Sequence, residues 1–279
     1  MVAYSCGPGR DLPTVDYDQV WREAAGPGTA SAVALVVHGL NVNPLRMDPL
    51  AHELNSWGVA TLRCTLSGHA NSLPAGEARL ASLRRVTYEL WREEVAAAYH
   101  VAVQQAERRN VPMMLVGFSL GGLIGCTAML HSATLRFARL ALFAPALRIR
   151  RRSRVLELLS RWPQLVVPSL TPVPYRANAG TPIAAYNALY AALRDFERSA
   201  GPRVNAPTLV FADPRDEMVS YGGLRQLLVQ HELTQWQLQP VHKAPDATTS
   251  YHHLLIDRES VGDEAWRQMM AQMRSHLGL

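Results

Sequence analysis

The chain has 279 residues, of which 48% are hydrophobic and 18% charged, so it holds enough apolar material for one large buried core. No stretch approaches the roughly 18 consecutive apolar residues of a membrane-spanning helix, and the first residues lack the basic start and apolar run of an export signal. The formal net charge is +5, but Lys243 is the only lysine; an arginine excess of this kind is more typical of a uniform compositional skew than of a nucleic-acid surface, so we expect no nucleic-acid partner.

Short apolar strands alternate with helical stretches along the chain. Residues 15–21 could form an edge strand or a short helix. Several of the strands that follow are continuous apolar runs, as expected for strands buried on both faces of a parallel sheet. The alternation predicts an α/β fold with a doubly wound, mostly parallel sheet. In chain order, strands are predicted at 32–37, 60–66, 111–116, 138–143, 207–212 and 234–241, and helices at 44–57, within 77–108, at 120–132, 222–231 and 263–276.

Residues 147–205 interrupt this alternation, because some sixty residues separate two strands. The segment contains a predicted helix at 183–196 and, before it, Pro163, Pro168, Pro172, Pro174 and Pro182. A connection of this length predicts a cap over the carboxyl ends of the strands or a partner surface, and we favour the cap. The core domain would then comprise residues 1–146 and 206–279. The apolar residues of the cap could line an acyl pocket or simply pack the cap onto the core: Leu156, Leu158, Leu159, Trp162, Leu165, Val166, Val167 and Leu170.

A cluster of arginines marks the start of this insertion. We interpret it as a solvated helix face, with a weak electrostatic contact to an anionic lipid or another acidic surface as the alternative. Its members are Arg148, Arg150, Arg151, Arg152 and Arg154.

The strongest local signal is the sequence Gly117-Phe118-Ser119-Leu120-Gly121, which directly follows a predicted strand and directly precedes an apolar helix. This is a G-x-S-x-G motif in the strand–turn–helix context that a nucleophile elbow requires. Glycines on either side of the serine relieve crowding at the sharp turn, and the helix amino terminus favours developing negative charge. The pattern predicts that Ser119 is a catalytic nucleophile.

An oxyanion formed at such a serine needs two N–H donors, and one of them would be the N–H of Leu120. The loop after the first predicted core strand reads His38-Gly39-Leu40-Asn41. With this His-Gly pair the chain resembles the α/β-hydrolase superfamily, and the resemblance implies the N–H of Leu40 as the second donor. His38 is expected to brace the loop, and Ser67-Gly68-His69 resembles a turn of esterases in which the histidine shapes the pocket floor.

In this superfamily the acid and the base follow the serine in the order Ser, Asp or Glu, His. The resemblance implies Asp216 as the acid, because family members typically carry an Asp three residues before a Val after this strand; Asp213 and Glu217 are the alternatives. The segment Ser250–Asp257 resembles an S-x-H-x-(apolar)-D stretch of bacterial carboxylesterases, which implies His252 as the base, with the adjacent His253 as the alternative. A metal site is not expected, because no suitably spaced partners accompany the two histidines.

The resemblance is strongest to bacterial carboxylesterases and monoacylglycerol-lipase-like hydrolases. It implies a serine carboxylic-ester hydrolase that acts on short- to medium-chain acyl esters, with monoacylglycerols as further candidate substrates. We expect no cofactor and no metal. The same triad also serves thioesterases, amidases, acyltransferases and carbon–carbon hydrolases, and the fold could serve as a non-catalytic binding protein. The three widely spaced cysteines, Cys6, Cys64 and Cys126, predict a reduced, cytoplasmic protein, and the sequence leaves the oligomeric state open.

Overall fold

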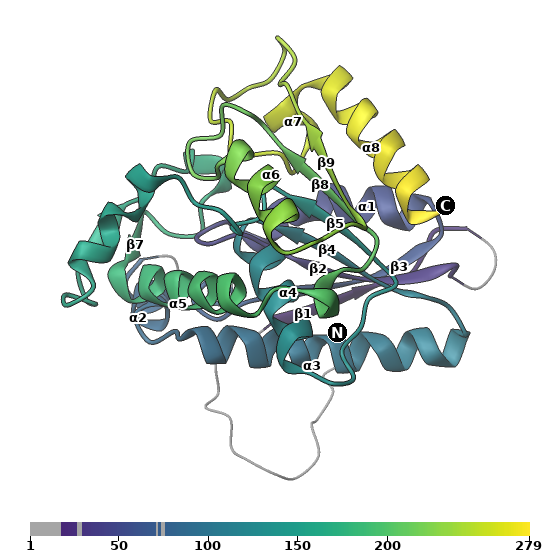
Figure 1. Cartoon of the computed structure of the whole chain (residues 1–279), viewed down its shortest axis with the longest axis horizontal. Coiled ribbons are helices and arrows are strands. Elements are labelled where there is room, and N and C mark those ends of the chain that lie inside the picture. Colours follow the sequence, from purple (N-terminus) through teal and green to yellow (C-terminus); the bar gives the residue numbers. More distant parts are fainter. Residues whose placement is uncertain (1–17, 27–29, 71, 74–75) are drawn as a thin grey trace.

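The computed structural model describes residues 18–26, 30–70, 72–73 and 76–279. Within these residues a seven-stranded sheet has the strand order β1-β3-β2-β4-β5-β8-β9 (Figure 1). Only the β1–β3 pair of this sheet is antiparallel among the described strands, so the predicted mostly parallel sheet is confirmed. The strands are β1 (Asp18–Arg22), β2 (Ala32–Val37), β3 (Val59–Thr65), β4 (Met113–Phe118), β5 (Arg139–Phe143), β8 (Thr208–Ala212) and β9 (Trp236–Pro240).

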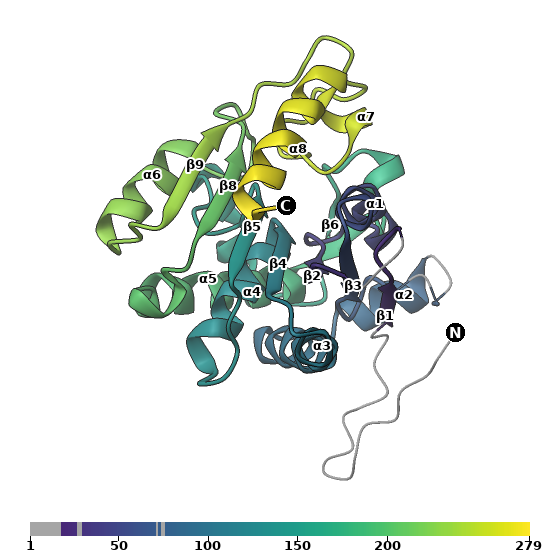
Figure 2. The ribbon, with the colours of Figure 1, turned by 90° about the vertical axis from the view of Figure 1, so that its right-hand side faces the viewer.

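Helices cover both faces of the sheet (Figure 2). Helices α1 (Asp48–Ser56) and α8 (Asp263–Leu277) pack on one face. The other face is covered by α3 (Tyr88–Arg109), α4 (Leu120–His131), α5 (Ile183–Ser199) and α6 (Tyr221–Gln230). The remaining short helices are η1 (Pro44–Met47), α2 (Glu77–Leu83), η2 (Arg151–Leu159), η3 (Val173–Tyr175), η4 (Pro202–Val204) and α7 (Arg258–Val261).

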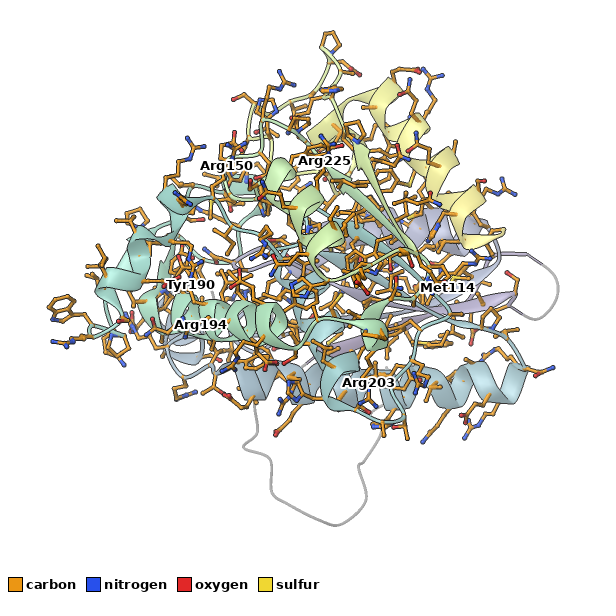
Figure 3. All side chains as sticks on the ribbon, viewed as in Figure 1. Met114, Arg150, Tyr190, Arg194, Arg203 and Arg225 are labelled. Atoms are coloured by element: carbon orange, nitrogen blue, oxygen red, sulfur yellow. The ribbon has the colours of Figure 1, made fainter. Side chains whose placement is uncertain are left out.

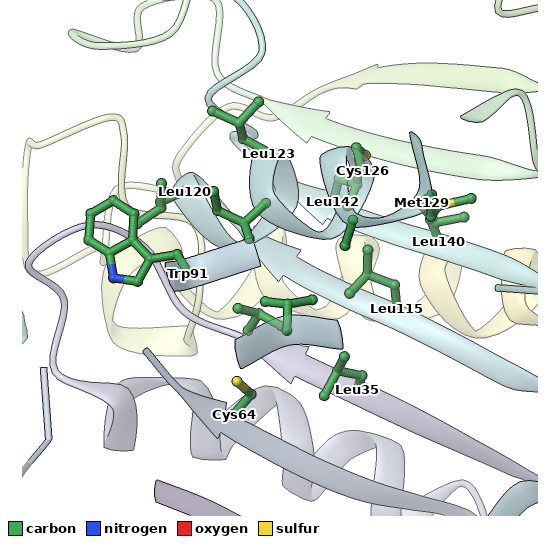
Figure 4. Packing of buried hydrophobic residues seen from close by; sticks show 14 of the residues in the cluster. Leu35, Cys64, Trp91, Leu115, Leu120, Leu123, Cys126, Met129, Leu140 and Leu142 are labelled. Atoms are coloured by element: carbon green, nitrogen blue, oxygen red, sulfur yellow. The ribbon is translucent and has the colours of Figure 1, made fainter. Parts of the chain in front are cut away.

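The central strands are buried because their side chains alternate between two apolar clusters. In β2, Leu35 joins the cluster under α3 and α4, whereas Ala34 and Val36 join the cluster under α1 and α8. Figure 4 shows part of the first cluster, to which Leu35 and Leu115 of the sheet and Leu123 and Cys126 of α4 belong. Continuous apolar runs thus arise because both faces of these strands need apolar side chains.

Two predicted helices are interrupted in the structure. The segment 44–57 forms η1 and then α1, and the segment 77–108 forms α2 and then α3. The side chain of Thr87 accepts a hydrogen bond from the Leu90 N–H at 3.1 Å and caps α3, which explains the second break. In the region 15–21, the residues from Asp18 onward form the edge strand β1, and residues 15–17 lie outside the described residues.

The insertion between β5 and β8 has two parts with different packing. Its helix α5 buries Ala185, Leu189 and Phe196 in the same cluster as α3 and α4. Strands β6 (Val166–Pro168) and β7 (Gly180–Pro182) form a small antiparallel sheet, whereas η2 buries none of its residues. In Figure 1 the segment of η2 projects from the end of the molecule beyond α5.

Cys64 and Cys126 are buried, and Cys6 lies outside the described residues. Among the helices described, none combines the length and the hydropathy needed to cross a membrane.

Candidate active site

Ser119 occupies a strained turn between β4 and α4. Its φ is 50°, a left-handed value that is unusual for a residue with a side chain. Two glycines allow the turn: a Cβ atom on Gly117 would lie 2.7 Å from the backbone of Gly122, and one on Gly121 would lie 2.3 Å from the carbonyl oxygen of Val37. The backbone therefore fits together only if both positions lack side chains.

His253 and Asp216 complete a hydrogen-bonded chain with this serine. The Nε2 atom of His253 lies 2.9 Å from the Ser119 Oγ, and its Nδ1 atom lies 2.8 Å from an Asp216 carboxylate oxygen. A carboxylate can only accept, so Nδ1 carries the proton and Nε2 is left to accept from the serine hydroxyl. The side chains of all three residues are nearly or fully buried.

The structure corrects the expectation that His252 lies beside the serine. The Nδ1 atom of His252 lies 2.8 Å from the buried carboxylate of Asp213, which makes a second His–Asp pair next to the first. The two histidines are the central residues of a turn closed by a 3.2 Å hydrogen bond from the Leu254 N–H to the Tyr251 carbonyl, and their rings point to different acids. Asp213 and Asp216 are both satisfied, and it is the pair of Asp216 with His253 that reaches Ser119.

Glu217, the third carboxylate of this loop, acts on the backbone of the histidines. Its two oxygens each accept one hydrogen bond at 3.1 Å, from the backbone N–H groups of His252 and His253. This bidentate contact ties the loop of Asp213 and Asp216 (the acid loop) to the turn of His252 and His253 (the histidine loop). The sequence pattern indicates Glu217 only as an alternative acid and does not predict this contact.

Asp216 is held in its ionised form. Burial works to raise the pKa of its carboxyl, but the charge of His253 and hydrogen bonds from His253, Val219 N–H and Met218 N–H outweigh burial and lower the pKa below its ordinary value. A buried carboxylate that stays ionised orients the imidazole and stabilises its protonated form.

Two basic residues brace these loops. The ammonium of Lys243 donates to the carbonyl oxygens of Thr249, at 3.2 Å, and Tyr251, at 2.7 Å, immediately before the histidine pair. Burial lowers the pKa of Lys243 to about 8 against the opposing pull of four carboxylates, of which Glu217 is the strongest. Arg150 donates to the backbone carbonyls of Pro214 and Asp216, so this member of the arginine cluster supports the acid loop and is not a solvated residue. In the sequence, the one sign of a special role for Lys243 is that it is the sole lysine.

The backbone N–H groups of Leu40 and Leu120 have no hydrogen-bond acceptor among the described residues. Leu120 is the first residue of α4, where the helix dipole adds positive potential. Leu40 lies in the loop after β2 and lines the same cavity as Ser119. Two free N–H donors at the serine are the arrangement that an oxyanion requires.

Two neutral histidines fix the loop that carries Leu40. The N–H of Leu66 donates to His38 Nε2 at 3.0 Å and the N–H of Asn41 donates to His69 Nε2 at 2.8 Å, so both rings carry their proton on Nδ1. Burial is the main cause that lowers the pKa of His38 well below its ordinary value and that of His69 to about 4. His38 braces the loop as expected. His69 accepts the hydrogen bond from Asn41 and does not line the cavity.

The insertion also contributes to this loop. Asn41 has a φ of 53°, and its side chain exchanges hydrogen bonds with the backbone of Asn178, from the Asn178 N–H at 2.8 Å and to the Asn178 carbonyl at 3.1 Å. The N–H of Ala177 donates to the carbonyl of Asn41 at 3.0 Å. A strap of the insertion, residues 174–180, is thereby fixed against the loop beside the serine.

A cavity of about 70 Å³ opens at Ser119 and His253. Its walls are mostly apolar, and none of the described residues that line it is acidic or basic apart from His253. Of the cap residues considered as acyl-pocket residues, only Leu170 lines it. The other lining residues are Leu40, Asn41, Val42, Phe118, Ala146, Ile149, Ser169, Thr171, Thr181, Tyr186, Leu189, Met218, Val219, Tyr251 and Leu254. Within the described part of the chain, no three His, Cys, Asp or Glu side chains are grouped to hold a metal ion.

The sheet order, the elbow at Ser119 and the hydrogen-bonded chain behind it define a hydrolase of the α/β-hydrolase fold. A sequence model of the family described as serine aminopeptidase, S33, matches residues 28–181, more than half of the chain. The chain belongs to this family. No curated protein matches it.

Solved structures share the whole fold. A structure from work on the metagenome-derived lipolytic enzymes LipS and LipT is 22% identical, with a TM-score of 0.70 over 97% of this chain and 100% of the other. A soluble variant of the monoglyceride lipase of Saccharomyces cerevisiae is 11% identical, with a TM-score of 0.76 over 96% and 93%. The monoacylglycerol lipase of Paleococcus ferrophilus is 17% identical, with a TM-score of 0.66 over 93% and 99%. At these identities the likeness establishes the fold.

Proposed function

We propose that this protein is a serine carboxylic-ester hydrolase whose triad is Ser119, His253 and Asp216. The observation that carries the proposal is the continuous hydrogen-bonded chain from the Ser119 Oγ through His253 to Asp216. His253 replaces His252 as the base, because only its ring reaches the serine.

The chemistry follows from the positions of the protons. As the Ser119 oxygen attacks the ester carbonyl carbon, its proton passes to His253 Nε2, and the N–H groups of Leu40 and Leu120 receive the negative oxygen. The intermediate collapses, His253 gives the proton to the departing alcohol, and an acyl-enzyme remains. Water, deprotonated by His253, then attacks the acyl carbon and releases the acid while the proton returns to Ser119.

The lining of the cavity favours an ester over the aminopeptidase substrate that the family's description names. An aminopeptidase must hold the charged amino group of its substrate, and burying an unpaired ammonium is costly. The described residues that line the cavity supply no carboxylate for it. An apolar acyl group needs no such partner.

The size of the cavity favours short acyl groups. One buried water needs about 10–15 Å³, so 70 Å³ holds roughly five waters or an acyl group of a few carbons. We assign residues 147–205 as the cap of this site, because Leu170 and Tyr186 of this segment line the cavity. Longer acyl chains, including those of monoacylglycerols, would require this cap to move.

The test compares hydrolysis of p-nitrophenyl esters, from acetate to dodecanoate, by the wild type and by Ser119→Ala. We expect the wild type to prefer the short esters and the variant to lose roughly 10⁴-fold or more in kcat/KM. A fluorophosphonate probe should label the wild type and leave the variant unlabelled. Substantial turnover by Ser119→Ala, or a preference for aminoacyl p-nitroanilides over esters, would refute the proposal.

A further inference from the structure

The basic charge of this chain is concentrated in one segment. Residues 147–182 contain seven arginines and a single acidic residue, Glu157, a formal charge of +6. The whole chain carries +5, so all the other residues together sum to −1. The arginine excess is therefore local, in contrast to the uniform skew expected from the composition.

Some of these arginines are engaged and others are free. Arg148 is paired with Glu197 and Arg154 with Glu157. Arg151 and Arg161 are exposed and have no carboxylate partner within the described part of the chain. The charge at this end of the molecule is thus available to an outside partner.

The same segment exposes most of the large apolar side chains on the surface. Of the eight large apolar residues that are exposed in the described chain, six lie between positions 155 and 173. Leu158 and Leu170 are each 75% exposed and Trp162 is 59% exposed. Residues 160–165 are all exposed in succession. The six are Val155, Leu158, Trp162, Leu165, Leu170 and Val173.

This basic apolar ridge, which we define as residues 151–173, reaches from the projecting end of the molecule to the active site. Its segment of η2 lies away from the sheet (Figure 1). In Figure 3 Arg150, which directly precedes the ridge, lies toward the upper left, and the buried Met114 of β4 lies toward the right. At its other end, Ser169, Leu170 and Thr171 line the cavity at Ser119. A surface that contacted the ridge would therefore lie next to the mouth of the cavity.

We propose that the basic apolar ridge docks on an anionic lipid surface. Leucine and tryptophan side chains partition into the boundary between headgroups and acyl chains, and arginines beside them pair with lipid phosphates. An exposed apolar patch with a basic margin matches this partner on both counts, whereas a nucleic acid or an acidic peptide would satisfy only the arginines. Docking would present the cavity to substrates dissolved in the lipid, and the docking itself requires no catalysis.

The experiment is co-sedimentation of the full chain with vesicles of phosphatidylcholine, with and without phosphatidylglycerol. We expect binding to the anionic vesicles that falls as salt is added. Arg151→Gln combined with Arg161→Gln should weaken binding roughly 30-fold, because each arginine near an anionic surface contributes a factor of roughly five. Trp162→Gln combined with Leu165→Gln should weaken it to a similar extent.

Matched controls lie on α6, outside the ridge. Arg225→Gln and Val229→Gln remove an exposed arginine and an exposed apolar side chain there and should leave vesicle binding unchanged. Ser119→Ala should bind vesicles as the wild type does, so that docking is judged separately from the proposed hydrolysis. The proposal is overturned if the ridge variants bind like the wild type, if neutral vesicles bind equally well, or if DNA or polyglutamate binds as tightly and Trp162→Gln changes nothing.

Discussion

Replacing each of the two adjacent histidines separately tests the assignment of the base. In His253→Ala the serine loses the imidazole that lies 2.9 Å from its hydroxyl, and one carboxylate oxygen of Asp216 loses the imidazole that donates to it. Removing the base of a triad leaves only substrate binding and the oxyanion donors to promote the reaction. We expect kcat/KM to fall roughly 10⁴-fold or more, equivalent to about 5 kcal/mol or more of transition-state stabilisation.

In His252→Ala the lost contact is the 2.8 Å hydrogen bond to the fully buried carboxylate of Asp213. Leaving a buried acceptor without its donor costs about 1–3 kcal/mol of unfolding free energy, while the chain from Ser119 to Asp216 stays intact. We therefore expect a clear loss in urea stability and a fall in kcat/KM of less than about tenfold.

Steady-state kinetics on p-nitrophenyl acetate and urea denaturation on the same samples separate the two effects. His252→Gln serves as the matched variant, because its amide can donate to Asp213 and should recover part of the lost stability. The reasoning is refuted if His252→Ala loses as much activity as His253→Ala, or if His253→Ala retains near wild-type turnover.

Four further predictions concern the elements that support the site. Glu217→Gln should lower kcat about 10- to 100-fold with little change in KM, because the single amide oxygen replaces two carboxylate oxygens that each accept one backbone N–H. Glu217→Asp keeps the charge and should be less impaired. Equal kinetics for Glu217→Gln and the wild type would contradict this prediction. Gly121→Ala should destabilise the fold by about 2 kcal/mol or more, because its Cβ would lie 2.3 Å from a backbone oxygen, whereas Gly222→Ala, with open space around it in α6, should be neutral or slightly stabilising in urea denaturation. Asn41→Ala should lower kcat roughly tenfold or more by releasing the loop that carries the Leu40 N–H, and an unchanged kcat would show that the strap at Asn178 does not position this donor. The folded state lowers the pKa of the Asp216 carboxyl below its ordinary value of 3.8, so the carboxylate contributes its full stability above that pH and loses it as the pH falls through the folded pKa. The difference in unfolding free energy between the wild type and Asp216→Asn should therefore shrink in acid. A difference that stays constant with pH would contradict the lowered pKa.

The amino-acid sequence by itself determined the class of fold and the position of the tight turn that carries Ser119. Both depend on local patterns: continuous apolar runs such as 32–37 mark strands buried on two faces, and glycines at positions 117 and 121 are needed wherever a serine projects from so tight a turn. These patterns hold whatever the rest of the chain does, because they follow from burial and from hard-sphere contacts.

Only the tertiary structure decided which histidine meets the serine. His252 and His253 are identical in type and adjacent in a loop without periodicity, and two aspartates were available to pair with them. The choice depends on the direction of each ring, which Glu217 and Lys243 set by holding the backbone on either side. Such contacts join residues that are distant in the chain, and a sequence pattern specifies the residue types present but not the direction in which a loop presents them.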